Sequence, residues 1–161
     1  MARYGGCLRS ENRGCPSQGT HKGCPYRTGD ADPLHTVRTC RGEAVRSKSE
    51  VIIANLLNDN GLDYRYEEPL TGSDGVVRYP DFTIDDAATG LKVYWEHLGM
   101  LGDPTYRTRW ERKLAWYRTQ GILPRAEGEG PAGTLVITSD DEQGGIDAAQ
   151  LEQVVREVFG L

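Results

Sequence analysis

The chain has 161 residues, of which 37% are hydrophobic and 27% are charged, a composition typical of one folded domain that can bury a core. No stretch approaches the roughly 18 apolar residues of a membrane-spanning helix, and the opening residues lack the apolar run of a secretory signal, so we expect a cytoplasmic protein with no membrane partner. The net charge is −5, but residues 1–48 carry nine Lys and Arg against four Asp and Glu, and the remainder carries ten against twenty. A negative net charge is unexpected for a protein that binds nucleic acid. It is compatible with phosphate binding if the acids surround a metal and the basic residues form a separate rim.

Residues 1–44 show no sustained helical or strand period and are rich in Gly, Arg, Ser and Thr. They predict a loop-rich extension ahead of a domain over residues 45–161. The extension holds four cysteines, separated by seven, eight and fifteen residues: Cys7, Cys15, Cys24 and Cys40. This spacing contains no Cys-x-x-Cys pair, although His21 precedes Cys24 by three residues and His35 lies near Cys40. A structural zinc site is one interpretation, and free thiols in a reducing cytoplasm are the favoured one.

Helices and strands alternate in the predicted domain. In chain order, we expect a helix over 50–57, strands over 64–68, 76–84 and 91–98, a helix over 104–120, a strand over 135–138 and a helix over 147–159. Ser47 can cap the first helix, where Glu50 completes the spacing of a capping box. Pro104 can begin the second helix, and Gly121 stops it. The order α-β-β-β-α-β-α, with turns at 71–75 and 86–90, predicts an α/β fold built around a three-stranded meander.

Two acids lie near the ends of neighbouring predicted strands, Asp81 and Glu96. Because strand side chains alternate between faces, each acid lies on the more polar face of its strand, and adjacent antiparallel strands could bring the two carboxylates together. On the first helix, Glu50 aligns with Ile53 and Leu57 and so projects toward the packed side. A buried carboxylate there needs a partner. Magnesium would provide one, because it prefers oxygen ligands and keeps several waters.

Phosphodiester hydrolysis needs a metal to polarise the phosphoryl oxygen, an activated water, and a cation against the developing charge. Lys113 is the candidate cation, since it lies between Trp110 and Tyr117 on the sheet-facing edge of the second helix. Each residue also has a simpler explanation: Glu50 as a capping acid, Asp81 as a strand-end acid, Lys113 as a solvated helix lysine. The convergence of all these residues on one α-β-β-β-α arrangement favours catalysis.

With these residues in place, the chain resembles the PD-(D/E)xK, or restriction-endonuclease-like, nuclease superfamily, whose core is αβββαβ with a mixed sheet. A closer resemblance is to the nuclease domain at the C-terminus of some bacterial DNA helicases, and it rests on residues 46–55 (RSKSEVIIAN), 80–82 (PDF), 95–101 (WEHLGML) and 110–117 (WERKLAWY). It covers about residues 45–160. The resemblance implies Asp81 and Glu96 as metal ligands, Glu50 as the helix-borne acid, and cleavage of DNA with Mg²⁺ or Mn²⁺.

One position departs from the superfamily pattern, which expects a lysine two residues after the second acid, where this chain has Leu98. Lys113 is the best substitute, and its spacing to Tyr117 is similar to the Gln-x-x-x-Tyr helix motif of some relatives, with Lys in the Gln place. The missing lysine also leaves a second hypothesis open, a catalytically inactive module that keeps the fold for binding DNA or protein. His97 lies on the opposite strand face from Glu96, and we interpret it as a core histidine beside Trp95.

The second helix also carries most of the candidates for contact with nucleic acid. The full candidate set is Arg107, Arg109, Arg112, Arg118, Tyr117 and Lys48. Arginines would bind backbone phosphates, and Tyr79 and Tyr106 could stack a splayed base, although a solvated helix face explains any single arginine and Lys48 can simply decorate the helix start. The expected partners are DNA, a helicase supplied as another polypeptide, and a second copy in a homodimer. DNA repair and defence against foreign DNA are both open.

Overall fold

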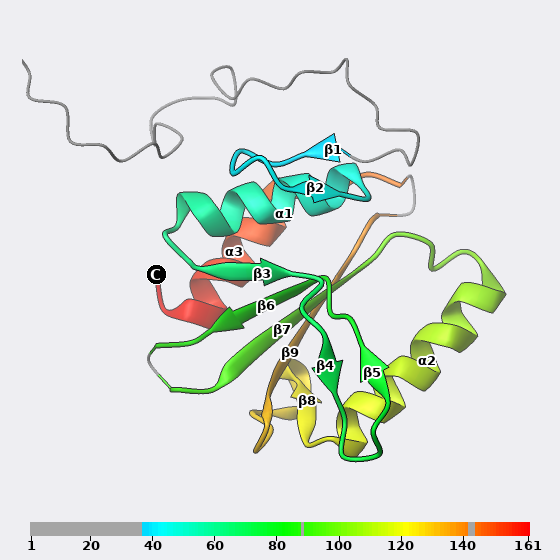
Figure 1. The fold of residues 1–161 in the computed structure, drawn as a ribbon. Helices are drawn as coiled ribbons and strands as arrows, with labels where there is room; N and C mark the ends of the chain where they lie inside the picture. Colours follow the sequence, from blue (N-terminus) through cyan, green and yellow to red (C-terminus); the bar gives the residue numbers. More distant parts are fainter. Residues whose placement is uncertain (1–36, 88, 142–143) are drawn as a thin grey trace, which may run out of the picture.

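The computed structural model describes residues 37–87, 89–141 and 144–161 (Figure 1). In chain order its elements are β1 (Val37–Arg38), β2 (Ala44–Val45), α1 (Lys48–Asp59), β3 (Tyr64–Tyr66), β4 (Leu70–Thr71), β5 (Val77–Arg78), β6 (Phe82–Asp85), β7 (Lys92–Leu98), α2 (Pro104–Thr119), β8 (Ile122–Pro124), the short 3₁₀ helix η1 (Arg125–Glu127), β9 (Gly133–Ser139) and α3 (Ala148–Phe159). The predicted α-β-β-β-α-β-α order is confirmed, with small additional strands between the main elements.

The fold is mixed α/β, and its centre is a five-stranded sheet in the order β3-β6-β7-β9-β8. The meander β3-β6-β7 is antiparallel, as the sequence predicts. The pairs β7-β9 and β8-β9 are parallel, which the α2 crossover between β7 and β9 makes possible. The C-terminal ends of β7 and β9 therefore meet at one edge of the sheet.

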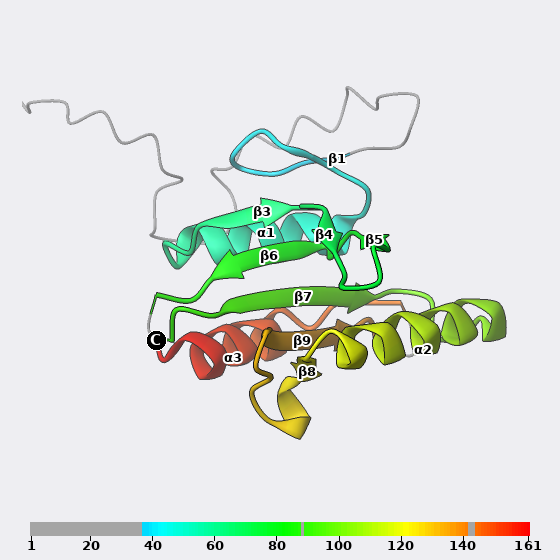
Figure 2. The same cartoon turned by 60° about the horizontal axis from the view of Figure 1, so that its bottom comes forward.

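Helices cover both faces of this sheet (Figures 1 and 2). On one face, α1 and α3 close the larger core, where Ile53 and Val155 are fully buried against Phe82 and Trp95. On the other face, α2 packs through Tyr117 and its neighbours onto the sheet. Since side chains alternate along β7, its odd-numbered Val93 and Trp95 enter the first core and its even-numbered residues face α2.

The start of α1 follows the predicted cap. Ser47 has extended backbone angles, and its Oγ accepts a 3.1 Å hydrogen bond from the Glu50 amide. The Glu50 carboxylate reaches back to the amide of Arg46 at 2.8 Å, one residue earlier than in a standard capping box. Glu50 is thereby held at the end of α1 that lies nearest the start of β6.

The prediction of one continuous strand over 76–84 is wrong. Residues Tyr79–Asp81 are irregular, and they separate β5, which pairs only with β4 in a small hairpin, from β6, which joins the central sheet. Pro80 explains the break, because it has no amide hydrogen to donate to a strand ladder. The strand predicted over 64–68 also ends early, where Glu67 adopts a φ of +47°. The short edge strand β8 was not predicted.

Among the residues that the structure describes, no helix is long and apolar enough to cross a membrane.

Candidate active site

Asp81 and Glu96 come together at one end of the central sheet. Since β6 and β7 pair Phe82 with Trp95, one further step of the register sets Asp81 opposite Glu96. Asp81 Oδ2 accepts a 2.6 Å hydrogen bond from the backbone amide of His97. The Glu96 side chain is only 5% exposed. The two carboxylates are therefore neighbours at the mouth of a largely buried site.

Lys113 reaches this pair from α2. Its Nζ lies 2.6 Å from Glu96 Oε1 and donates a 2.9 Å hydrogen bond to the carbonyl oxygen of Tyr79. One turn further along α2, the Tyr117 hydroxyl donates to the same Glu96 Oε1 at 2.5 Å. Leu98, where the superfamily pattern has its lysine, is buried and uncharged. The structure thus brings a helix-borne cation to the second acid, although the catalytic role of Lys113 stays a prediction.

The pKa values of both carboxylates are raised, so the protonated forms are favoured. The pKa of Asp81 is raised to about 7, chiefly by burial and next by the charge of Glu96, while the His97 amide and Lys113 oppose the rise. The pKa of Glu96 is raised as well, again by burial, against the charge and hydrogen bond of Lys113. Perturbed carboxylates of this kind are common at catalytic and metal sites.

Glu50 lies close enough for its charge to raise the pKa of Asp81 further, but its own contacts are structural. Its Oε2 accepts hydrogen bonds from the Tyr66 hydroxyl at 2.6 Å and from the Arg46 amide. The Tyr66 contact was not foreseen, because it joins α1 to a strand sixteen residues away and no local pattern marks it. Glu50 therefore borders the site and also stabilises the start of α1.

The donor set fits a hard divalent cation held by two carboxylates. No residue in the described part of the chain donates a hydrogen bond to Asp81 Oδ1 or Glu96 Oε2, so one oxygen of each acid is spare. A cation beside these oxygens would relieve the repulsion between the two acids, and Mg²⁺ and Mn²⁺ both prefer oxygen ligands. Within the described ranges no three His, Cys, Asp or Glu side chains are grouped closely enough to hold a metal. Glu50 accordingly does not join Asp81 and Glu96 as the expected third ligand.

His97 lies on the other face of β7, as predicted, in a network of hydrogen bonds. Its Nε2 is 2.9 Å from Asp140 Oδ1 and its Nδ1 is 3.0 Å from Thr138 Oγ1. Asp140 also accepts from Ser49 at the start of α1, and Thr138 accepts from Trp95. The ring is thus fixed, and its backbone amide is fixed with it against Asp81. Asp140 follows β9 at the sheet edge where β7 ends, a position that the parallel pairing explains and the sequence pattern did not.

The four predicted arginines lie on α2, but they do not form one patch. At 100° per residue, Arg109 falls near the direction of Lys113, whereas Arg107 and Arg118 fall on the opposite side. Arg118 is also held by Glu127, with its Nε 3.1 Å from Glu127 Oε2. All four are exposed. Arg109 is therefore the arginine best placed to meet a ligand of the carboxylate site.

Two other predicted contacts with nucleic acid fall in different surroundings. Tyr117 is fully buried, and its hydroxyl donates a hydrogen bond to Glu96. In this conformation its ring has no exposed surface on which a base could stack. Lys48 is the exposed first residue of α1. Tyr106, one α2 turn before Trp110, lies near the acids, since burial and then the charges of Asp81 and Glu96 raise its pKa.

Most of the cysteine prediction lies outside the described residues, because Cys7, Cys15 and Cys24 belong to residues 1–36. Cys40 is described. It is disulfide-bonded, which contradicts the favoured interpretation of a free thiol at this position, and its amide donates a 2.7 Å hydrogen bond to Asn55 Oδ1. The described part of the chain therefore offers no support for the zinc interpretation.

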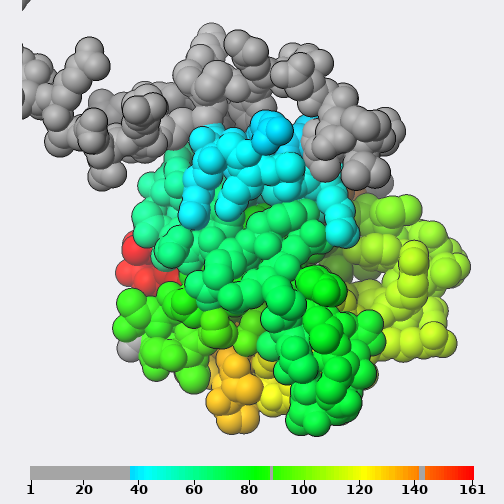
Figure 3. All heavy atoms as spheres, in the orientation of Figure 1, coloured from blue at the N-terminus to red at the C-terminus, as the bar shows by residue number. Residues whose placement is uncertain are grey.

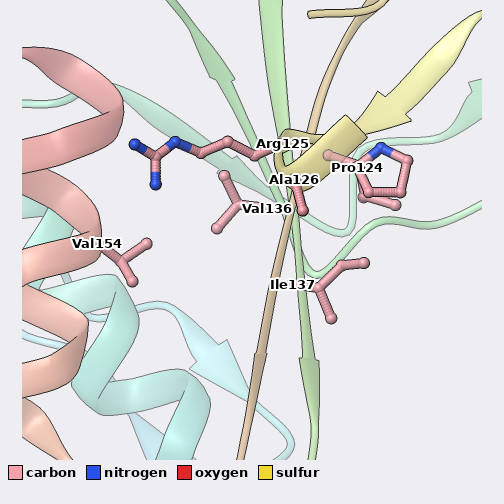
Figure 4. A pocket seen from close by; sticks show the side chains of 7 residues that line it. Pro124, Arg125, Ala126, Val136, Ile137 and Val154 are labelled. Carbon is pink, nitrogen blue, oxygen red and sulfur yellow. The ribbon is translucent and has the colours of Figure 1, made fainter. Parts of the chain in front are cut away.

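A surface hollow of about 480 Å³ lies beside β9, between η1 and α3 (Figure 4). It is lined by Pro124, Arg125, Ala126, Leu135, Val136, Ile137 and Val154. None of the residues predicted from the sequence to act in catalysis lines it. The lining of this hollow is mostly apolar and includes no acid, so the carboxylate pair remains the candidate site.

Comparison with known proteins leaves the family of this chain open. No protein-family model matches it. An uncharacterized protein of Methanocaldococcus jannaschii is 37% identical over 85 residues, which are 52% of this chain but 7% of that protein. About half of the chain therefore corresponds to a small part of a much longer relative, and the name of that relative assigns no activity.

Proposed function

We propose that this chain is a divalent-metal-dependent nuclease that hydrolyses the phosphodiester bonds of DNA. The observation that carries the proposal is the meeting of Asp81 and Glu96 at one sheet end, with Lys113 Nζ 2.6 Å from Glu96. Two carboxylates with spare oxygens could hold the metal that phosphodiester hydrolysis uses, and Lys113 supplies a cation beside them.

The arrangement of elements supports the same proposal. The succession α1-β3-β6-β7-α2-β9, with β7 and β9 parallel, has the αβββαβ order and the mixed sheet that the resemblance to restriction-endonuclease-like nucleases implies. Asp81 precedes the middle strand of the meander and Glu96 lies in the next strand, as in that pattern. We therefore propose a restriction-endonuclease-like core.

Each group of the site has a chemical task in this proposal. Asp81 and Glu96 would hold Mg²⁺ or Mn²⁺, which when bound polarises a phosphoryl oxygen and lowers the pKa of its water. Lys113 keeps a positive charge beside the same acids, where negative charge grows on the phosphate in the transition state. Tyr117 and the His97 amide fix the two carboxylates by hydrogen bonds, so little reorganisation is needed when substrate binds.

A second candidate function, an inactive module that binds DNA or protein, rests on a specific observation. Lys113 is already paired with Glu96, and an ammonium beside the carboxylate can stand in for a metal and leave a closed, idle site. The relative is more than ten times as long as its matched segment, which is compatible with a module that acts as part of a larger protein or complex. A helicase partner is part of either proposal.

Cleavage of supercoiled plasmid in Mg²⁺ or Mn²⁺ tests the proposed function. Wild type should nick or linearise the plasmid, EDTA should stop it, and Asp81→Ala and Glu96→Ala should each lower the rate by about 10²-fold or more. Asp85→Ala, an exposed acid four residues after Asp81, is the matched control and should cut like wild type. Equal cleavage by wild type and Asp81→Ala would refute the nuclease, and an inert wild type would favour the inactive module.

A further inference from the structure

The mouth of the carboxylate site carries exposed apolar side chains. Tyr79 is 54% exposed, Met100 58% and Leu101 37%. Single exposed apolar residues are ordinary, but Tyr79 lies close in sequence to Asp81, and Met100 and Leu101 lie close to Glu96. Lys113 donates a hydrogen bond to the carbonyl oxygen of Tyr79. The Tyr79 backbone is thereby held beside the site, and its side chain is exposed to solvent.

Met100 and Leu101 stand on the neighbouring strand end. Continuing the β6–β7 register sets Tyr79 opposite Leu98, and the exposed pair follows two and three residues after Leu98, past the end of β7. The backbone of the intervening Gly99 forms a hydrogen bond with Tyr106 of α2. Exposed apolar side chains therefore lie close in sequence to both acids.

The part of α2 next to the acids is basic. Arg109 lies one turn before Lys113 on α2, and the exposed Arg112 lies beside it. The first turns of α2 extend past the end of the sheet (Figure 2). The space-filling view is hollowed between this part of α2, in lime, and the body of the molecule (Figure 3). A ligand of the carboxylate site would therefore find an exposed aromatic side chain at Tyr79 and a guanidinium group at Arg109.

That combination selects a nucleic acid with exposed base faces. In a duplex the base faces are stacked and only their edges can be contacted, whereas a single strand offers π faces to aromatic side chains and its phosphates to arginines. We propose that the site takes single-stranded DNA, with a base stacked on Tyr79 and a phosphate against Arg109. The assignment of this strand as a substrate rests on the proposed nuclease function, while the binding itself does not.

Fluorescence anisotropy with the full-length chain tests the binding step. A labelled single-stranded 20-mer and its blunt duplex are titrated in EDTA, so that no cleavage occurs. The Kd for the single strand should be at least tenfold lower than for the duplex. Tyr79→Ala should raise the single-strand Kd about tenfold, since stacking on one aromatic ring is commonly worth that much or more. Tyr79→Trp should keep the wild-type value.

Matched controls separate stacking from general surface effects. Val76→Ala removes another exposed apolar side chain, in the β4–β5 hairpin, and Arg156→Ala removes an exposed arginine of α3. Both should stay within about twofold of wild type, whereas Arg109→Ala should weaken binding and flatten its salt dependence. Equal or tighter duplex binding, no measurable single-strand binding, or an unchanged Kd in Tyr79→Ala would overturn the proposal.

Cleavage of the same two oligonucleotides in Mg²⁺ distinguishes this proposal from the nuclease. If neither is cut but the single strand binds through Tyr79, the nuclease fails and the binding site stands. If the duplex is cut in an Asp81-dependent way and Tyr79→Ala cuts both oligonucleotides like wild type, the nuclease stands and the single-strand site is refuted.

Discussion

At the scale of single residues, the protonation state of Asp81 affects both the stability of the fold and the binding of a metal. Burial and the charge of Glu96 hold its pKa near 7 in the folded protein, well above the ordinary value for an aspartate in an unfolded chain. The folded state therefore favours the protonated acid, and this contribution to stability is lost as pH rises through about 7. Metal binding needs the ionised acid, so cleavage should increase over the same pH range.

Asp81→Asn should stabilise the metal-free protein at pH 8. The amide removes the repulsion with Glu96 and can still accept the His97 hydrogen bond, so we expect a gain of about 1–3 kcal/mol that fades toward pH 4. Urea unfolding at both pH values measures it. Asp85→Asn is the control, since ion pairs with Arg65 and Lys92 lower the Asp85 pKa, and its loss should not stabilise. An Asp81→Asn protein that is no more stable than wild type at pH 8 would contradict the account.

Lys113→Ala should damage both stability and cleavage. Its removal leaves Glu96 buried without its cation, which we expect to cost about 2 kcal/mol, below the 3–5 kcal/mol of a fully buried pair, and to slow cleavage about 10²-fold. Lys92→Ala serves as the comparison, because Lys92 makes exposed ion pairs on the sheet and should affect neither property much. Thermal unfolding and a plasmid assay give the two readouts, and a fully active Lys113→Ala protein would remove the lysine from the proposed chemistry.

At the scale of elements, α2 carries the cation and the basic border of the site, so the order of its first turns matters. Asp103 caps the helix by accepting a 2.7 Å hydrogen bond from the Thr105 amide, and Asp147 caps α3 in the same way. Asp103→Ala and Asp147→Ala should each cost about 1 kcal/mol.

Only Asp103→Ala should also weaken single-strand binding, because it loosens the turn that presents Tyr106 and Arg109. Chemical unfolding and anisotropy on both variants test this. Equal binding by the two variants would show that the start of α2 takes no part in the site.

The main elements were predictable because their signals are local. Ser47, Pro104 and the apolar spacing of α1 and α3 mark helices through capping and periodicity, and turn residues separate the meander strands. The break at Pro80 was missed because an alternating run around it outweighed one proline. β8 was not predicted because a strand of three residues is too short to show an alternation of apolar and polar side chains. Parallel pairing of β9 with β7 follows from the crossover through α2.

The pairing of Asp81 with Glu96 was predictable from the antiparallel meander, although Asp81 lies just before β6 and only Glu96 lies within a strand. The sequence pattern placed Lys113 on the sheet-facing edge of its helix. It could not predict that Lys113 Nζ lies 2.6 Å from Glu96 Oε1. Tyr66, Tyr117 and Asp140 form hydrogen bonds with residues of elements that are distant in sequence. No single-residue pattern encodes such contacts.

At the scale of the whole molecule, a metal site built from repelling acids should couple ion binding to folding. Mg²⁺ binds only the folded chain in this account, so millimolar Mg²⁺ should raise the melting temperature of the wild type at pH 8. The same ion should leave the melting temperature of Asp81→Asn nearly unchanged, since the site has lost one ligand charge. Scanning calorimetry with Mg²⁺ and with a matched NaCl control measures the difference. Equal shifts in both proteins would place the ion elsewhere.

A crystal soaked in Mn²⁺ and measured for anomalous scattering tests the proposed metal site directly. We expect one peak at about 2–2.3 Å from an oxygen of both Asp81 and Glu96, lost in Asp81→Ala crystals. A wild-type crystal in which these carboxylates hold no manganese, with Lys113 still bound to Glu96, would contradict the proposed metal site.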